Sequence, residues 1–317
     1  MDTSGQSTQV ALRTENLTKH YGTVVGLEDL DLVVNAGEVV GYLGPNGAGK
    51  TTTIRLLLGL IKPTAGRAEI FGMDTQAEKV AVHARVAYVP GEATLWPSLT
   101  GAETLHLLAR MHGQTDVAYR GRLVERFDFD ASRKVRAYSK GNRQKINLIA
   151  ALVTRADLLI LDEPTAGLDP LMEQAFRESV LEARDNGQTV FLSSHVLSEV
   201  EALCDRIAIL RAGRLVEIGT LAEMRHLSAV TVEATFAGAP PADVAKVAGV
   251  SAVQVTGHNL TCQVRGPVDE LVTVLAAGHP QTLLSREPSL EELFLSIYGE
   301  REHMNGGARR NGQVHRG

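Results

Sequence analysis

The sequence has only two cysteines and no apolar run that approaches the length of a membrane span. Cys204 and Cys262 stand far apart in the chain, which excludes a disulfide framework and a cysteine-based zinc site. A membrane-spanning helix needs about 20 predominantly apolar residues, and no such stretch occurs. Residues 1–9 are polar and lack an apolar core, so they do not predict a secretory signal. A reduced, cytosolic setting is therefore expected.

An excess of basic charge is also lacking. The 317 residues carry a formal net charge of −5, which argues against a general nucleic-acid binder. A composition of 44% hydrophobic and 22% charged residues is that of a globular protein, and the length suffices for two domains.

Residues 10–225 alternate strand-length apolar runs with helical patterns. Unbroken apolar runs separated by helices predict parallel strands buried on both faces, and hence an α/β fold. Residues 10–38 instead alternate in short pieces with glycine turns, which predicts an antiparallel sheet. Residues 98–155 predict a helical subdomain that opens on a capping box of Thr100 and Glu103. The expected parallel strands lie in EVVGYLG, ARVAYVP, LLILDEP, TVFLSSH and RIAILRAG.

The pattern changes after residue 228. Residues 228–300 predict a small α+β domain with a βαββαβ order of the ferredoxin-like kind. Residues 1–9 and the Gly-, Asn- and Arg-rich residues 301–317 are predicted to be flexible or disordered. The expected elements are strand 230–236, helix 242–247, strands 253–256 and 259–264, helix 268–277, strand 281–286 and helix 289–298.

Residues 44–52, GPNGAGKTT, lie between an apolar strand pattern and an amphipathic helix. Gly44, Gly49, Lys50 and Thr51 have the P-loop spacing, in the strand-to-helix context that this motif requires. Glycines allow backbone N–H groups to converge on phosphate oxygens, while the lysine contacts the β- and γ-phosphates and the threonine hydroxyl ligates Mg²⁺. The alternative is a glycine-rich turn with a chance Gly-Lys-Thr. The residues expected to bind ATP here are Gly44, Pro45, Asn46, Gly47, Ala48, Gly49, Lys50, Thr51 and Thr52.

Two acids follow the apolar strand of LLILDEP. Asp162 and Glu163 emerge at the carboxyl end of that strand, where open α/β sheets bind ligands. Asp162 is expected to hold Mg²⁺, through water, and Glu163 to polarise the attacking water. Acids that are merely solvated at a strand end are the alternative, and the P-loop counts against it.

The order of these motifs resembles the nucleotide-binding subunits of ATP-binding cassette (ABC) transporters. The series runs from an aromatic residue at Tyr21 through GPNGAGKTT, a loop at 88–97, YSKGN at 138–142 and LLILDEPTAGLDP to His195 in FLSSH. The resemblance covers about residues 10–225. It implies a P-loop ATPase core, an antiparallel β subdomain and a helical subdomain that carries the family's signature motif.

The resemblance also implies roles for single residues. YSKGN departs from the usual LSGGQ signature at three positions but keeps Ser139 and Gly141, which in the family close over ATP held by a second subunit. Tyr21 corresponds to the aromatic residue that stacks on adenine, although a tyrosine packed on the sheet is the alternative. Asp169 resembles the residue that links the two sites of the dimer. His195 resembles the γ-phosphate contact, whereas its position after an apolar strand alone would suggest a buried neutral histidine.

The loop AYVPGEATLW differs from most cassettes. It has Gly91 where they have a glutamine that helps to bind Mg²⁺ and the attacking water. Either the following Glu92 takes over this duty as a metal ligand, or the loop couples to its partner in a different way. A carboxylate suits hard Mg²⁺, which favours Glu92.

The single cassette, YVPGE, YSKGN and the closing SLEELFLSIYGE resemble the exporter ATPases of the daunorubicin-resistance type. This implies a subunit on the cytoplasmic face of the membrane that binds ATP and Mg²⁺ and pairs with a second copy or a paralogue. It would drive a separate polytopic permease that expels a drug, an antibiotic or a lipid-like molecule. The alternatives are an importer subunit and a soluble ABC ATPase that acts on ribosomes or DNA.

Overall fold

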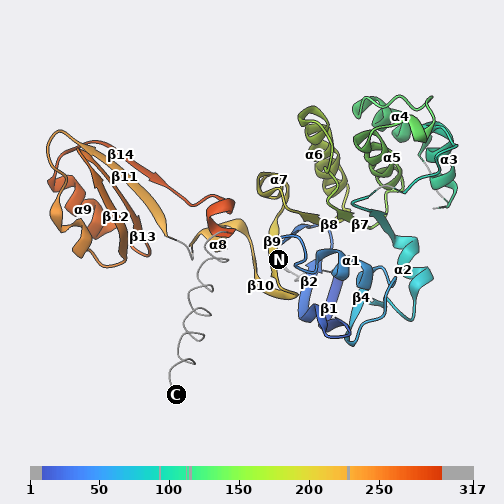
Figure 1. Ribbon diagram of the computed structural model, residues 1–317, viewed down its shortest axis with the longest axis horizontal. Coiled ribbons are helices and arrows are strands. Elements are labelled where there is room, and N and C mark those ends of the chain that lie inside the picture. The colour runs from blue at the N-terminus through green and yellow to red at the C-terminus, as the bar shows by residue number, and fades with distance from the viewer. Residues whose placement is uncertain (1–8, 93, 112, 114–115, 227–228, 295–317) are drawn as a thin grey trace, which may run out of the picture. The chain divides into compact units, whose positions relative to one another are not determined.

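The computed structural model describes residues 9–92, 94–111, 113, 116–226 and 229–294 (Figure 1). Their contacts divide the chain into two compact units between Gly219 and Thr220. The flexible segments expected at residues 1–8 and 301–317 lie outside the described residues. So does the part of the last expected helix beyond residue 294, whereas residues 290–294 are helical.

A six-stranded sheet forms the centre of the N-terminal unit (Figure 1). Its strand order is β10-β9-β3-β8-β7-β6, and only β10 runs antiparallel to its neighbour. Every residue of β3, β7 and β8 is buried, as the unbroken apolar runs predict. The predicted parallel α/β core is therefore confirmed. The strands are β3 (Val39–Leu43), β6 (Val86–Val89), β7 (Leu158–Asp162), β8 (Thr189–Ser194), β9 (Arg206–Arg211) and β10 (Arg214–Gly219).

The start of the chain forms the expected antiparallel sheet, in the order β2-β1-β4-β5. Polar residues alternate with apolar ones because one face of this sheet packs on the core and the other meets water. The strands are β1 (Val10–Tyr21), β2 (Val24–Asn35), β4 (Ala65–Ile70) and β5 (Met73–Asp74).

Two apolar clusters cover the faces of the six-stranded sheet. Leu159 and Leu161 of β7 pack toward helices α5 and α6, whereas Leu158 and Ile160 pack toward α1 and the antiparallel sheet. This alternation follows from the two-residue period of a strand. The helices of this unit are α1 (Lys50–Leu57), α2 (Lys79–Arg85), α3 (Gly101–Met111), α4 (Val117–Arg126), the 3₁₀ turn η1 (Val135–Ala137), α5 (Lys140–Val153), α6 (Pro170–Asp185) and α7 (Leu197–Leu203).

The predicted capping box at the start of α3 is confirmed. The Thr100 amide donates to Glu103 Oε2 at 2.7 Å, and the Glu103 amide donates to Thr100 Oγ1 at 3.2 Å. Each side chain thus satisfies one of the amides that a helix start leaves without a partner.

The C-terminal unit is a four-stranded antiparallel sheet in the order β12-β13-β11-β14. Most predicted bounds agree with the structure. Strand β12 begins three residues earlier than expected, because a register shift between Ser251 and Gln254, at Ala252 with φ 51°, lets the pairing continue past the irregularity. The predicted helix 242–247 is a single 3₁₀ turn. The elements are α8 (Leu221–His226), β11 (Val230–Phe236), η2 (Ala242–Lys246), β12 (Val250–Thr256), β13 (Asn259–Val264), α9 (Asp269–Ala277) and β14 (Pro280–Arg286).

Among the residues described, no helix combines the length and the apolar character that crossing a bilayer requires.

Candidate functional site

Three neighbouring parallel strands of the central sheet, β3, β8 and β7, end at the same edge of that sheet. The P-loop follows β3, Glu163 follows β7 and His195 follows β8. Because β3, β8 and β7 are parallel neighbours, segments that are far apart in the sequence meet at their carboxyl ends. The predicted site residues of these three segments therefore come together.

The P-loop requires its glycines. Gly47 and Gly49 have φ angles of 81° and 113°, which side chains disfavour. A Cβ on Gly49 would lie 2.6 Å from the Gly26 carbonyl oxygen, too close for any other residue. Lys50 is buried, with its Nζ donating to the Gly44 carbonyl oxygen at 2.6 Å. Its ammonium group is thereby held at the mouth of the loop, where the N-terminus of α1 begins.

A cavity of about 480 Å³ opens over this loop. Tyr21 contributes to its wall and is 46% exposed, so the ring rests on the neighbouring strand β2 and still stays accessible from the cavity. A Cβ on Gly26 would come within 2.8 Å of the Tyr21 ring, so a glycine at that position leaves room for it. Gly44 and Ala48 do not line the cavity; both are buried within the loop. The lining residues are Tyr21, Val24, Val25, Gly26, Pro45, Asn46, Gly47, Gly49, Lys50, Thr51, Thr52 and Glu163.

Thr51 and Asp162 form an oxygen pair at the floor of the site. The Thr51 hydroxyl donates to Asp162 Oδ2 at 3.2 Å, and the Ser193 hydroxyl donates to Asp162 Oδ1 at 2.5 Å. Among the described residues, no three His, Cys, Asp or Glu side chains gather as a complete metal cage. One hydroxyl and one carboxylate nevertheless suit Mg²⁺, which takes few protein ligands and completes its shell with water and phosphate oxygens. The donor set fits this ion.

Glu163 lies between the P-loop lysine and the histidine. Its Oε1 is 3.7 Å from Lys50 Nζ and 3.5 Å from His195 Nδ1. Its backbone turns sharply, with φ 48°, and its amide donates to the Ser193 carbonyl oxygen at 3.0 Å. His195 is 57% exposed, so the buried-histidine reading is wrong. The Glu163 carboxylate thus lines the P-loop cavity, and the His195 imidazole lies against that carboxylate.

A second cavity of about 470 Å³ adjoins the first and shares Thr51 and Glu163 with it. Glu92 lines it together with Asp162, and the role of Glu92 as a metal ligand stays a prediction. A Cβ on Gly91 would lie 3.2 Å from the Asp162 carbonyl oxygen, so the loop passes close to β7. Burial, helped by the charge of Asp162 and opposed by that of Arg55, raises the pKa of Tyr88 in this wall to about 12.

The signature residues serve their own chain in addition to any partner. Ser139 caps α5 by accepting a hydrogen bond from the Asn142 amide at 3.2 Å, and it is exposed. A Cβ on Gly141 would collide with the Gly167 carbonyl oxygen, so this glycine also allows a close backbone approach. Asp169 caps α6 through the amides of Leu171 and Met172. These three residues are not among those that line the P-loop cavity.

Two features of the site were missed from the sequence. Ser193 contacts both Asp162 and the Glu163 amide, and Val24 and Val25 line the nucleotide cavity. The signal for Ser193 was its place as a small polar residue at the end of an apolar strand, two positions before His195. No local pattern points to the valines.

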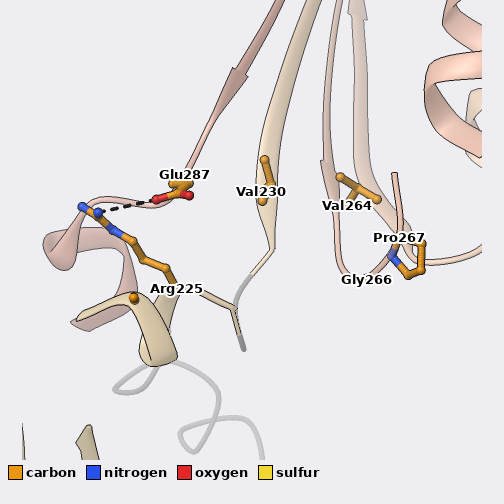
Figure 2. A pocket seen from close by; sticks show the side chains of 7 residues that line it. Arg225, Val230, Val264, Gly266, Pro267 and Glu287 are labelled. Carbon is orange, nitrogen blue, oxygen red and sulfur yellow. Dashed lines mark ion pairs between the residues drawn. The ribbon is translucent and has the colours of Figure 1, made fainter. Parts of the chain in front are cut away.

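The C-terminal unit has a cavity of its own, of about 420 Å³ (Figure 2). Val230, Val264 and Pro267 supply apolar walls, and Arg225 pairs with Glu287 at 3.5 Å. Arg225 also donates to the Pro288 carbonyl oxygen. The charge in this cavity is therefore compensated within the unit.

Comparisons with known proteins agree with this geometry. Residues 27–166 match the family described as ABC transporter. The chain is 34% identical to the linearmycin resistance ATP-binding protein LnrL of Bacillus subtilis, over 91% of this chain and 98% of that protein. It is 37% identical to the daunorubicin resistance ATP-binding protein DrrA3 of Streptomyces coeruleorubidus, over 92% and 96%. A solved ATP-binding subunit of an ABC transporter superposes with a TM-score of 0.64 at 35% identity, over 68% of this chain and 92% of that one.

Proposed function

The chain belongs to the ABC transporter family, as an ATP-binding subunit, and from this premise we propose that it hydrolyses ATP to drive an exporter. The observation that carries the proposal is the convergence of Lys50, Glu163 and His195 at the carboxyl ends of three neighbouring strands. Phosphoryl transfer to water needs positioning and charge stabilisation, and this arrangement offers both.

In the proposed mechanism, the P-loop amides and Lys50 bind the β- and γ-phosphates, and Tyr21 stacks on the adenine. Thr51 and Asp162 hold Mg²⁺, with Glu92 as a further ligand, and the ion when bound neutralises phosphate charge. Glu163 accepts a proton from the attacking water, and His195 contacts the γ-phosphate and keeps the Glu163 carboxylate in place.

A second subunit completes the site in this proposal. Ser139 and Lys140 are exposed at the N-terminus of α5, where a helix end favours an anion. Because Ser139 does not line the cavity of its own P-loop, it is available to the ATP of another copy or of a paralogue. Asp169 would link the two sites across the dimer.

The named relatives support the type of transport. Proteins called linearmycin and daunorubicin resistance ATP-binding proteins align over nearly the whole chain, so we extend drug or antibiotic export to this one. A separate polytopic permease would anchor it at the cytoplasmic face of the membrane. The Trp96 side chain is 44% exposed and follows the loop that lines the second cavity. An exposed aromatic side chain of this kind suits contact with a permease.

We assign residues 10–225 to the ATPase domain and residues 228–300 to an accessory domain. The structure's own division falls slightly earlier, after Gly219. The antiparallel order β12-β13-β11-β14 supports a ferredoxin-like class for the accessory domain.

The test is the Glu163→Gln variant. Loss of a general base costs about 10²–10⁴-fold in rate, whereas the amide keeps the shape of the side chain and leaves ATP binding intact. We expect turnover to fall by this factor, ATP affinity to stay near that of the wild type, and ATP to induce a stable dimer by sedimentation. Glu178→Gln, on the exposed side of α6, is the matched control. Turnover like that of the wild type would contradict the catalytic role.

The transport role has its own test. Tagged Glu163→Gln protein is purified from native membranes with ATP, and the copurifying proteins are identified. A polytopic permease supports export, and a solute-binding partner would indicate import instead. Ribosomes or DNA would leave the ATPase in place and overturn the transporter.

A further inference from the structure

A buried carboxylate lies behind the site and has no part in the mechanism above. Glu199 belongs to α7, the short helix that follows His195, and only 5% of it is exposed. Among the described residues, no lysine, arginine or histidine forms an ion pair with Glu199, and burying an acid in this way is costly. The cost of burying this carboxylate indicates that it has a role in the structure.

The contacts of Glu199 join the two segments that carry the catalytic pair. Its Oε2 accepts a hydrogen bond from the Ser194 hydroxyl at 2.9 Å and another from the Thr165 hydroxyl at 3.2 Å. Ser194 immediately precedes His195, and Thr165 comes two residues after Glu163. Both hydroxyls are buried, so water does not compete for these bonds. One oxygen thus ties the end of β8 to the turn after β7.

The surroundings of Glu199 favour its neutral form. Burial raises the pKa of this carboxyl, and the hydrogen bonds from Ser194 and Thr165 oppose the rise. From α6, the charge of Glu173 raises it further and that of Arg177 lowers it. The second oxygen, Oε1, is buried and makes no hydrogen bond in the described part of the chain. Two hydroxyl groups thus hold the Glu199 carboxyl through one of its oxygens.

We propose that Glu199 is a positioning residue that sets the spacing between Glu163 and His195. These two side chains lie 3.5 Å apart, and each directly follows the end of a strand, outside the hydrogen-bonded ladder of the sheet. The Ser193 contacts fix the Glu163 backbone from one side, and the Glu199 bridge fixes the following turn relative to the His195 loop. The proposal rests on the ATPase function proposed above.

The first test compares Glu199→Ala with Glu199→Gln. The alanine removes the bridge, and misplacement of a catalytic group by about 1 Å can cost 10²-fold, so we expect kcat to fall by about 10- to 100-fold. The affinity for ATP should stay within about twofold, because the P-loop is untouched. The glutamine keeps an oxygen that accepts both hydroxyls and should restore most of the rate. Glu201→Gln, on the exposed side of the same helix, is the matched control.

The second test asks whether Glu199 acts through His195. In single-turnover assays, Glu199→Ala should cost little more in a His195→Ala background, since the group that it positions is gone. Equal losses in both backgrounds would overturn the proposal, and so would an unchanged kcat in Glu199→Ala. If the alanine variant does not fold, Thr165→Val removes one arm of the bridge in a side chain of similar shape. Unchanged kcat there, in a folded protein, would also overturn the proposal.

The two proposals can fail separately. If Glu163→Gln abolishes turnover and Glu199→Ala leaves it unchanged, the positioning role is wrong and the ATPase mechanism stands. If Glu163→Gln turns over like the wild type, the proposed mechanism itself fails.

Discussion

The P-loop cavity and the cavity of the C-terminal unit are similar in size and very different in chemistry. The P-loop cavity, of about 480 Å³, gathers glycines with left-handed backbones, a buried lysine and a carboxylate. The cavity of the C-terminal unit, of about 420 Å³, has apolar walls and one ion pair whose charges cancel (Figure 2). The two cavities therefore differ little in volume. They differ in chemistry, because only the P-loop cavity has convergent polar groups whose charge remains available to a ligand.

The largest expected difference in ATP turnover comes from replacing a lysine in each of the two units. Lys50→Ala removes the only side-chain cation that the described residues place among the lining of the P-loop cavity, and we expect turnover to fall by about 10²–10³-fold or more. Lys246 is an exposed lysine of the C-terminal unit that pairs with Asp243, and Lys246→Ala should change ATP turnover little. ATP hydrolysis by both variants at saturating nucleotide measures the contrast. Comparable losses would show that the two units do not differ as described.

A smaller effect is expected at the second wall of the nucleotide site. Glu92 lines the adjoining cavity with Asp162, so Glu92→Ala should lower turnover by about tenfold, as expected for one of several groups that share the binding of Mg²⁺ and water. ATP affinity measured without hydrolysis should change less than turnover. Higher Mg²⁺ concentration should recover part of the rate. Turnover that is unchanged at every Mg²⁺ concentration would remove Glu92 from the site.

The smallest effect is expected in the C-terminal cavity. Arg225→Ala breaks the pair with Glu287, which is more than half exposed, so we expect a loss of about 1 kcal/mol or less in the free energy of unfolding. Basal ATP turnover should stay unchanged. Chemical denaturation and the turnover assay measure the two quantities. A large loss of turnover would give this cavity a function that its compensated charge does not suggest.

The features predicted best from the sequence depend on residues close together in the chain. The Thr100–Glu103 capping box and the Ser139 cap involve partners three residues apart, and both form as sequence patterns suggest. The P-loop spacing likewise fixes which backbone positions need glycine. The single 3₁₀ turn at residues 242–246, predicted as a longer helix, shows the limit of this approach, since apolar spacing over one or two turns does not distinguish the two helix types.

The exposure of His195 could not be read from its neighbours. A histidine after the buried strand β8 would ordinarily continue into the interior, but the chain leaves the sheet edge there and the side chain faces solvent and Glu163. Glu199 was missed for a related reason. In the sequence it is an ordinary acid in a short helix, and only packing against the end of β8 and the turn after β7 buries it.

Local sequence patterns specify the phosphate loop, the alternation of strands and helices, and the two acids at the end of a strand. These follow from backbone sterics, side-chain size and hydrogen bonds within a few residues. Only the tertiary structure decided which of these groups meet. Thr51 reaches Asp162, and Asp162 pairs in register with Ser193, because β7 and β8 lie side by side in the sheet. Thr51 and Asp162 are 111 residues apart in the chain, and they meet through tertiary packing that no local pattern records.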